Sequence, residues 1–145
     1  GGWVDKFMGD GMLAVFGAPR QLSNHAEQAL QAAQQILRQG KTQCPLPIGI
    51  GLHSGPIVAG CLGATGRLEF TVIGDTVNVA SRLESLTKDW STPLLMSGST
   101  ARQLRSQPAL TALGSVPIRG REQGIEIFTL PEVGNPEKSM STGAV

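Results

Sequence analysis

The stretch "LEFTVIGDTVNVASRLE", residues 68–84, changes from a strand pattern to a helix pattern at its single glycine. Its first seven residues predict a strand. Asp75 or Thr76 can cap the helix that follows. The apolar positions that recur at helical spacing in this helix are Val77, Ala80 and Leu83. A strand that leads directly into an amphipathic helix indicates a domain that mixes both kinds of element.

The same stretch holds three polar side chains with possible binding roles. Asn78 and Arg82 are four residues apart, so they lie on one face of the helix. The Arg82 guanidinium offers a fork of donors that fits phosphate oxygens, and Asn78 can orient a sugar or a phosphate. Thr71 precedes them on the strand, and its hydroxyl can accept from an exocyclic amine. Periodicity also allows an ordinary capped helix with an arginine on its solvent side.

Toward the N-terminus, "WVDKFMGDGMLAVFG" (residues 3–17) predicts a hairpin that turns at Gly9-Asp10-Gly11. The Asp10 carboxylate at this turn can hold Mg²⁺, a hard cation that favours oxygen ligands, although a second acid is then expected. Lys6 lies on the first strand, where its ammonium can donate to a ring nitrogen or an anion. The alternative is a solvated hairpin with two surface charges.

The remaining patterns extend the alternation of helices and strands. Ala26, Leu30, Ala33 and Leu37 recur at helical spacing, and we expect Gly40 to end that helix. Further strands are expected at 47–63 (two extended pieces), 93–97, 111–118 and 124–130, with a short helix at 98–106. The predicted class is α+β with a largely antiparallel sheet. We expect one domain over residues 1–130 and a disordered tail over residues 131–145.

Composition excludes several classes of function. The chain has 145 residues with 12 basic and 11 acidic side chains, a net charge of +1, which argues against a broad nucleic-acid footprint but allows a small polyanion such as a nucleotide. No apolar run approaches the ~20 residues of a membrane span. Cys44 and Cys61 are interpreted as reduced thiols, which is consistent with a cytoplasmic domain. There is no P-loop motif.

The loop "RGREQG" (residues 119–124) lies between the last two predicted strands. Its Arg119 and Arg121 could clamp a polyphosphate. Arginines on a loop more often serve only solubility.

Taken together, "VDKFMGDGMLAVFGAP" (4–19), "IGIGLHSGPIVAGCLG" (48–63) and "EFTVIGDTVNVASRLE" (69–84) resemble the class III adenylate/guanylate cyclase catalytic domain. The motifs stand in the family's order and spacing, and "IRGREQGIEIF" (118–128) matches its final hairpin. The resemblance runs from Gly1 to about residue 130. It implies a ferredoxin-like nucleotidyl cyclase fold, with helices packed on a mostly antiparallel sheet.

The resemblance also implies roles for the base-reading and metal residues. Lys6 matches the lysine that reads the purine, and Thr71 occupies the position that selects the base with it. A lysine–threonine pair is similar to that of bacterial adenylate cyclases, whereas guanylate cyclases typically carry glutamate and cysteine. Asp10 matches the second of two aspartates that bind Mg²⁺ or Mn²⁺, with two ions in each site.

Further residues are implied to act on the ribose and the phosphates. Asn78 and Arg82 match the pair that orients the ribose and stabilises the transition state. Arg119 stands where the family has a cationic phosphate ligand, and Arg121 is a weaker candidate. The implied reaction is attack of the ribose 3′-hydroxyl of ATP on the α-phosphorus, which yields 3′,5′-cyclic AMP and pyrophosphate.

In this family the active site lies between two chains of a head-to-tail dimer. Asp10 of one chain is then expected to work with Lys6, Thr71, Asn78 and Arg82 of the other. The family's first strand and helices, with the first metal aspartate, would precede Gly1, so we expect a truncated domain that is inactive alone. Sensor or membrane domains often precede such domains. The alternatives are a guanylate cyclase and a non-catalytic homology module for dimerisation or regulation.

Overall fold

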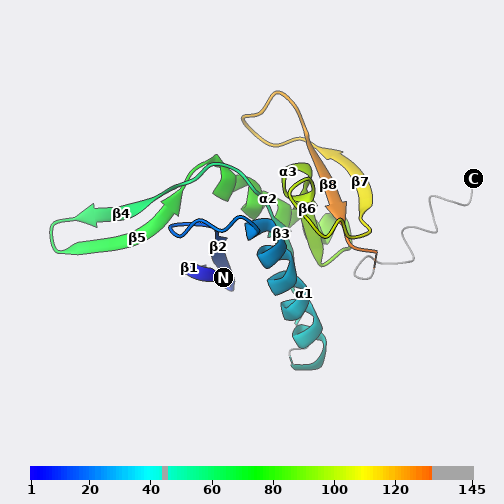
Figure 1. The fold of residues 1–145 in the computed structure, drawn as a ribbon, viewed down its shortest axis with the longest axis horizontal. Helices are drawn as coiled ribbons and strands as arrows, with labels where there is room; N and C mark the ends of the chain where they lie inside the picture. Colours follow the sequence, from blue (N-terminus) through cyan, green and yellow to red (C-terminus); the bar gives the residue numbers. More distant parts are fainter. Residues whose placement is uncertain (44–45, 132–145) are drawn as a thin grey trace, which may run out of the picture.

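The structure is a computed structural model that describes residues 1–43 and 46–131 (Figure 1). Its strands are β1 (Gly2–Met8), β2 (Gly11–Phe16), β3 (Ile50–Leu52), β4 (Val58–Ala64), β5 (Arg67–Ile73), β6 (Leu94–Ser97), β7 (Thr111–Val116) and β8 (Ile125–Thr129). Its helices are α1 (His25–Gln43), α2 (Asp75–Asp89) and α3 (Gly98–Ala101). Cys44 and residues 132–145 of the predicted tail lie outside the described residues.

The strands form one central sheet and two separate hairpins. The central sheet has the order β3-β6-β8-β7, in which β3 and β6 are parallel and the other pairs are antiparallel. The hairpins β1–β2 and β4–β5 are both antiparallel. The predicted α+β class with a largely antiparallel sheet is therefore confirmed.

Strand β6 connects the two parts of the core. All four of its residues are buried, and its side chains alternate between the two faces of the sheet. Leu94 and Met96 pack with the apolar face of α1, whereas Leu95 packs with α2. The α1 residues in the first cluster are the predicted ones, namely Ala26, Leu30, Ala33 and Leu37. Each helix therefore covers a different face of one strand.

The buried face of α2 differs from the predicted one. Val79 and Leu83 are fully buried against Leu95, whereas Val77 and Ala80 are only partly buried. The predicted face, defined by Val77, Ala80 and Leu83, therefore lies toward one edge of the face that is buried. Packing against the sheet selects the rotation that buries the larger Val79–Leu83 pair.

The predicted caps of α2 are wrong. The residue before the helix is Gly74, with φ 144°, and no side chain caps the helix. Thr76 instead donates its hydroxyl proton to the Pro56 carbonyl at 2.7 Å. Asp75 is the first helical residue, and its carboxylate pairs with Arg121. Both candidate capping side chains therefore bind partners that are distant in the sequence.

Two element ends also differ from expectation. Helix α1 continues past Gly40 to Gln43, because Gly40 serves close packing rather than a left-handed stop: a Cβ there would lie 2.8 Å from Ile48 Cδ1. Helix α3 ends at Ala101, well short of the predicted residue 106. Within the described residues, no helix combines the length and apolar character needed to cross a membrane.

We predict that Gly51→Ala destabilises the domain by about 1–3 kcal/mol, the usual range for overpacking. Gly51 lies on β3 directly against the backbone of α2, and an added Cβ would meet Ala80 O, Glu84 N and Leu83 C. The helix would have to move away from the sheet. Chemical denaturation, monitored by circular dichroism, measures this change.

Gly60→Ala is the matched control for this substitution. Gly60 also lies in a strand, and a Cβ there would have nothing within 4 Å. Its unfolding free energy should stay near that of the wild type. Equal unfolding free energies for the two variants would contradict the proposed contact.

Candidate functional site

The candidate site begins at an irregularity in β1. The register of the β1–β2 pair shifts between Val4 and Lys6, so Asp5 is the extra residue of a bulge. In a regular strand Asp5 and Lys6 would point to opposite faces, and a bulge re-aims side chains. Here the Asp5 Oδ2 atom lies 3.4 Å from Lys6 Nζ.

Asp5 also joins this hairpin to β5. The Thr71 hydroxyl donates to Asp5 Oδ2 at 2.8 Å. The Asp5 side chain is 0% exposed, whereas that of Lys6 is 43% exposed. Nearby, the rings of Trp3 and Phe70 are tilted at 46° with centroids 5.6 Å apart. The two hairpins are thus held together by a ring contact and a polar bridge.

Lys6 and Thr71 face a hollow of about 350 Å³ between the hairpins. Its lining residues are Asp5, Lys6, Leu62, Glu69, Phe70 and Thr71. Directly opposite Thr71 on β4 stands Gly60, which has no side chain to cover it. The structure therefore brings together the two residues predicted to read a base, and adds a buried carboxylate between them.

The predicted metal ligand lies at the tip of the same hairpin. Gly9 and Asp10 form the turn, Met8 pairs with Gly11, and Asp10 is exposed. Among the described residues there is no cluster of three or more His, Cys, Asp or Glu side chains that could hold a metal. The exposed Asp10 carboxylate offers hard oxygen donors of the kind that Mg²⁺ prefers.

Asn78 and Arg82 occupy the exposed face of α2, one turn apart. The strand that carries Thr71 leads through Gly74 into this helix. In the described part of the chain, neither side chain has a hydrogen bond or ion pair, and neither contacts Lys6 or Asp10 through one. In the single chain their positions also agree with the alternative interpretation, an arginine on a solvated helix face.

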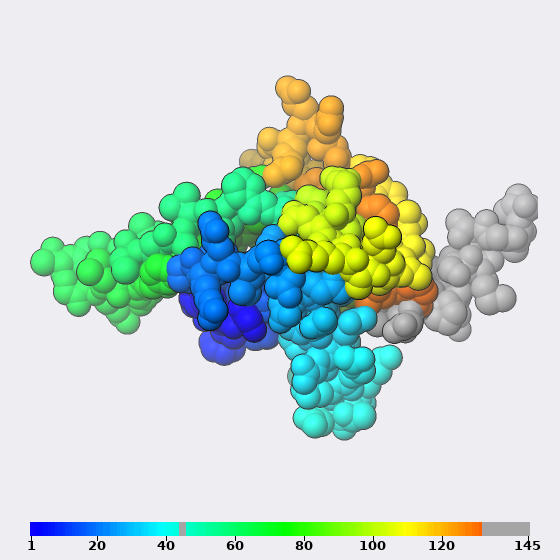
Figure 2. Space-filling model, in the orientation of Figure 1, coloured from blue at the N-terminus to red at the C-terminus, as the bar shows by residue number. Residues whose placement is uncertain are grey.

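The two loop arginines have different surroundings. Arg119 is exposed on the loop between β7 and β8, which projects from the body of the molecule in Figures 1 and 2. Arg121 donates from Nε and Nη2 to Asp75 Oδ2, at 3.0 and 2.6 Å. Arg121 is therefore committed to the first turn of α2, while Arg119 is free to meet an anion within the described structure.

A polar cluster lies at the end of β3, near the Arg121–Asp75 pair. His53 Nδ1 lies 2.8 Å from Ser97 Oγ and 3.3 Å from Ser99 Oγ. Burial lowers the pKa of His53 below its ordinary value of 6.5, and the positive charge of Arg121 lowers this pKa further, while Asp75 acts in the opposite direction. His53 is thus a neutral hydrogen-bonding residue near pH 7.

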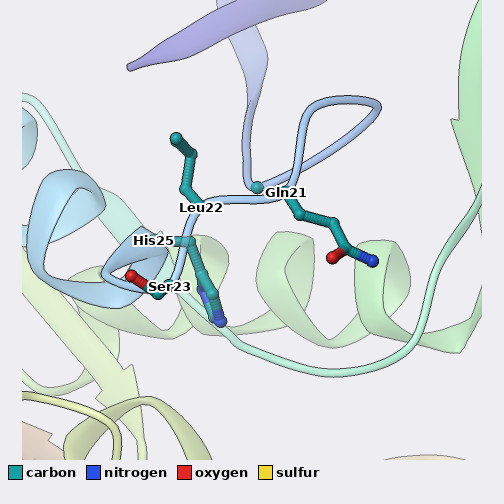
Figure 3. A pocket seen from close by; sticks show the side chains of 5 residues that line it. Gln21, Leu22, Ser23 and His25 are labelled. Carbon is teal, nitrogen blue, oxygen red and sulfur yellow. The ribbon is translucent and has the colours of Figure 1, made fainter.

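A larger hollow, of about 600 Å³, lies where β2 leads into α1 (Figure 3). In Figure 3 the Gln21 and His25 side chains extend to one side of the loop and Leu22 to the other. None of the predicted site residues lines this hollow. The smaller hollow is the better candidate because it is lined by Lys6 and Thr71, two of the predicted site residues.

Both hairpins carry large apolar side chains on their surfaces, and the β4–β5 hairpin extends away from the body of the molecule (Figures 1 and 2). The exposed apolar residues of these hairpins, which we call the hairpin apolar surface, are Val4, Phe7, Met8, Met12, Val58, Leu62, Leu68, Phe70 and Ile73. Phe7 and Leu68 are 78% and 72% exposed. Large contiguous apolar patches are typical of interaction sites, which makes these hairpins candidates for contact with a partner.

Asp5 is the functional candidate that sequence reasoning missed. Its signal was present, since an acidic residue stands inside an otherwise apolar strand beside Lys6. The bulge that turns Asp5 toward Thr71, 66 positions away, carries no glycine or proline signal in the sequence. The burial of the Asp5 carboxylate can therefore be recognised only in the structure.

Comparisons with known proteins identify similar chains. The family model described as "Adenylate and Guanylate cyclase catalytic domain" matches residues 5–132. An adenylate cyclase of Anabaena cylindrica is 38% identical over 140 residues, which cover 88% of this chain and 28% of that protein. The chain thus spans about a quarter of the length of the curated relatives that it matches.

Solved structures of cyclases are also similar to this chain. A bacterial light-regulated adenylyl cyclase matches with a TM-score of 0.80 and 28% identity, over 93% of this chain and 40% of that one. The guanylate cyclase domain of RhGC from Catenaria anguillulae, solved in complex with GTP, matches with a TM-score of 0.70 and 28% identity. That match covers 88% of this chain and 70% of that one.

We predict that His53 makes the protein less stable as the pH falls below about 6.5. Its pKa is lower in the folded state than in the unfolded state, so the unfolded state takes up the proton first and is favoured by acid. The loss of stability begins near the pKa of His53 in the unfolded state and is complete below its pKa in the folded state. Thermal unfolding midpoints at pH 7.5 and 5.5 should show it.

His53→Gln should reduce the difference between these two midpoints, because glutamine does not titrate. His25→Gln removes the other histidine of the chain and leaves the contacts of His53 in place. That variant should keep the part of the pH dependence that His53 causes. A His53→Gln protein with the full wild-type difference would exclude this role.

Proposed function

The chain belongs to the adenylate and guanylate cyclase catalytic domain family, and from this premise we propose that it acts on ATP, as part of an adenylate cyclase. The single observation that carries this specificity is the convergence of Lys6 and Thr71 on one hollow. The proposed products are 3′,5′-cyclic AMP and pyrophosphate. A cytoplasmic location belongs to the same proposal and agrees with the free thiol of Cys61.

Base recognition follows from the hydrogen-bonding capacity of the two side chains. The Lys6 ammonium can only donate, so it suits the N1 acceptor of adenine. The Thr71 hydroxyl can accept from the adenine N6 amine, which guanine replaces with an O6 acceptor. Lys6 is partly exposed and Thr71 is uncovered on its β4 side, so both can reach a ligand.

The reaction joins O3′ to the α-phosphorus and breaks the bond from the α-phosphorus to the bridging oxygen of pyrophosphate. The hydroxyl proton is released, and negative charge grows on the phosphoryl oxygens and the leaving group. Arg82 offers a fixed cation for that charge, and Asn78 beside it can hold the ribose. Arg119, exposed and unpaired within the described residues, suits the outer phosphates.

A divalent cation fits the donor chemistry of Asp10. Mg²⁺ is commonly held by one or two carboxylates together with substrate phosphates and water. Asp10 is an exposed carboxylate at a turn, with no ion pair within the described structure. When bound, Mg²⁺ or Mn²⁺ would lower the pKa of the 3′-hydroxyl and neutralise phosphate charge. We propose Asp10 as one ligand of a two-ion site.

We propose that the working unit is a head-to-tail homodimer. Within the described chain no hydrogen bond or ion pair joins Asp10 to Asn78 or Arg82, and a second copy could bring these groups to one substrate. The hairpin apolar surface supports this assembly because a partner that covers these side chains removes apolar area from water, which favours association. Asp10 of one chain would then act with Lys6, Thr71, Asn78 and Arg82 of the other.

A guanylate cyclase is the second candidate, favoured by the similar domain that was solved with GTP. Lysine could also donate to guanine O6. Initial rates with ATP and with GTP, measured on the protein at its natural length, decide between the two. We expect cyclic AMP as the main product, and a preference for GTP would overturn the proposed specificity.

We predict that Arg82→Ala lowers kcat by about 10²–10³, the usual loss when one donor to a developing negative charge is removed. Lys88→Ala is the control because Lys88 is an exposed cation near the end of the same helix. Its turnover should stay close to that of the wild type. Cyclic AMP formation under saturating ATP measures both, and near-normal turnover by Arg82→Ala would remove Arg82 from the site.

A mixing experiment tests the shared site directly. Asp10→Ala and Arg82→Ala chains should each be inactive, whereas a refolded or co-expressed mixture should recover about a quarter of wild-type activity if the chains pair at random. Half of the dimers would be mixed, and each would hold one site with both residues intact. Inactivity of a mixture that is shown to contain mixed dimers would indicate a site built within one chain.

A further inference from the structure

We propose that Asp5 is a positioning residue that determines base specificity. Its carboxylate accepts a hydrogen bond from the Thr71 hydroxyl. Because that hydroxyl has no second proton, Thr71 can only accept a hydrogen bond from the purine. This inference rests on the proposed function because it takes Lys6 and Thr71 as the groups that contact the base. Asp5 itself acts through these two residues.

The burial of Asp5 is the first observation behind this role. The side chain is 0% exposed, and its Oδ1 atom has no hydrogen-bond partner among the described residues. A buried carboxylate oxygen without a partner loses its hydration and so destabilises the fold. Stability alone therefore does not account for an aspartate here, and its charge must serve another purpose.

The direction of the Thr71–Asp5 hydrogen bond is the second observation. A carboxylate has no proton to give, so at 2.8 Å the hydroxyl must be the donor. A threonine hydroxyl has one proton and two lone pairs. Once the proton points to Asp5, only lone pairs remain for a ligand in the hollow.

The same carboxylate oxygen also holds the neighbouring cation. Asp5 Oδ2 is 3.4 Å from Lys6 Nζ, and this ammonium keeps further protons for a ligand because it has three donors. One buried oxygen atom thus places an obligate donor next to an obligate acceptor. The bulge at Asp5 makes this possible, since it brings the side chains of consecutive residues to one side.

This arrangement matches adenine and opposes guanine. Adenine presents an N1 acceptor and an N6 amine donor, whereas guanine presents an N1–H donor and an O6 acceptor. In the same pose, guanine would set O6 against the Thr71 lone pairs and N1–H against the ammonium. A hydroxyl that was free to rotate could donate to O6, so without Asp5 the threonine would no longer oppose guanine, and only the ammonium would discriminate between the two bases.

Asp5→Leu tests the inference with little change of shape, because leucine branches at the same carbon as aspartate and has no atom that accepts a hydrogen bond. The Thr71 hydroxyl proton is then free to turn toward a ligand. The ratio of kcat/KM for ATP to kcat/KM for GTP should fall about tenfold, which is the effect of one mispaired polar contact. A purely structural defect would lower both rates and leave their ratio unchanged.

Glu126→Leu is the matched control. Glu126 lies on β8 and does not line the hollow, and its side chain is 64% exposed, with Arg102 at 3.2 Å. The substitution removes a paired carboxylate by the same kind of chemical change but outside the candidate site. The ratio should stay at its wild-type value, and an equal fall in both variants would indicate a general charge effect and overturn the inference.

Thr71→Val provides a second route if Asp5→Leu does not fold. Valine has nearly the same shape and lacks the hydroxyl through which Asp5 is proposed to act, so this variant should lose much of the ATP preference. In the Thr71→Val background, Asp5→Leu should not change the ratio further. An unchanged ATP preference in Thr71→Val, or a full additional effect of Asp5→Leu, would overturn the inference.

The outcomes separate this inference from the proposed function when the intact protein is used. If the wild type prefers ATP and Asp5→Leu keeps that preference, the function stands and the role of Asp5 is wrong. If the wild type forms neither cyclic nucleotide, the function is wrong, and the ratio of the Kd values for ATP and GTP, from calorimetry, tests Asp5 separately. A wild type that prefers GTP overturns both.

Discussion

The structure depends on the burial of β6, which supplies core side chains to both faces of the central sheet. Leu94 and Met96 hold α1, and Leu95 holds α2. Each such side chain contributes about 1.5–3 kcal/mol when it is removed from water. Because one strand anchors both helices, their positions are coupled, and a shift of β6 by one residue would exchange the two sets of side chains.

The position of α2 then determines what the site can present. Burial of Val79 and Leu83 leaves Asn78 and Arg82 on a neighbouring, exposed side of the helix, because successive residues are about 100° apart. The close contact of Gly51 with the backbone of α2 fixes how near the helix lies to β3. The core and the proposed transition-state residues are therefore two faces of the same helix, and packing on one face orients the other.

The sequence predicted the class of fold, the hairpins and the helical face of α1 because these depend on local periodicity and on turn residues. It missed the caps of α2, since Asp75 and Thr76 found partners that are distant in sequence. It also misread Gly40 as a stop, because close packing and a left-handed turn both favour glycine. The proximity of Lys6 and Thr71 was implied by the resemblance to the cyclase family. The burial of the Asp5 carboxylate between them depends on a bulge in β1, and no local sequence pattern predicts that bulge.

The polar bridge at Asp5 lies outside both core clusters, and this location is physically informative. A hairpin with its apolar residues exposed gains little stability from its own packing, so a buried carboxylate there is a burden that the central core must offset. The same carboxylate joins the two hairpins through Thr71 and sets the polarity of the hollow between them. An apolar residue would join the hairpins with less loss of hydration but would leave the Thr71 hydroxyl free to donate or accept. The charge of Asp5 is therefore explained by the proposed role in recognition, within a fold whose stability comes from the two core clusters.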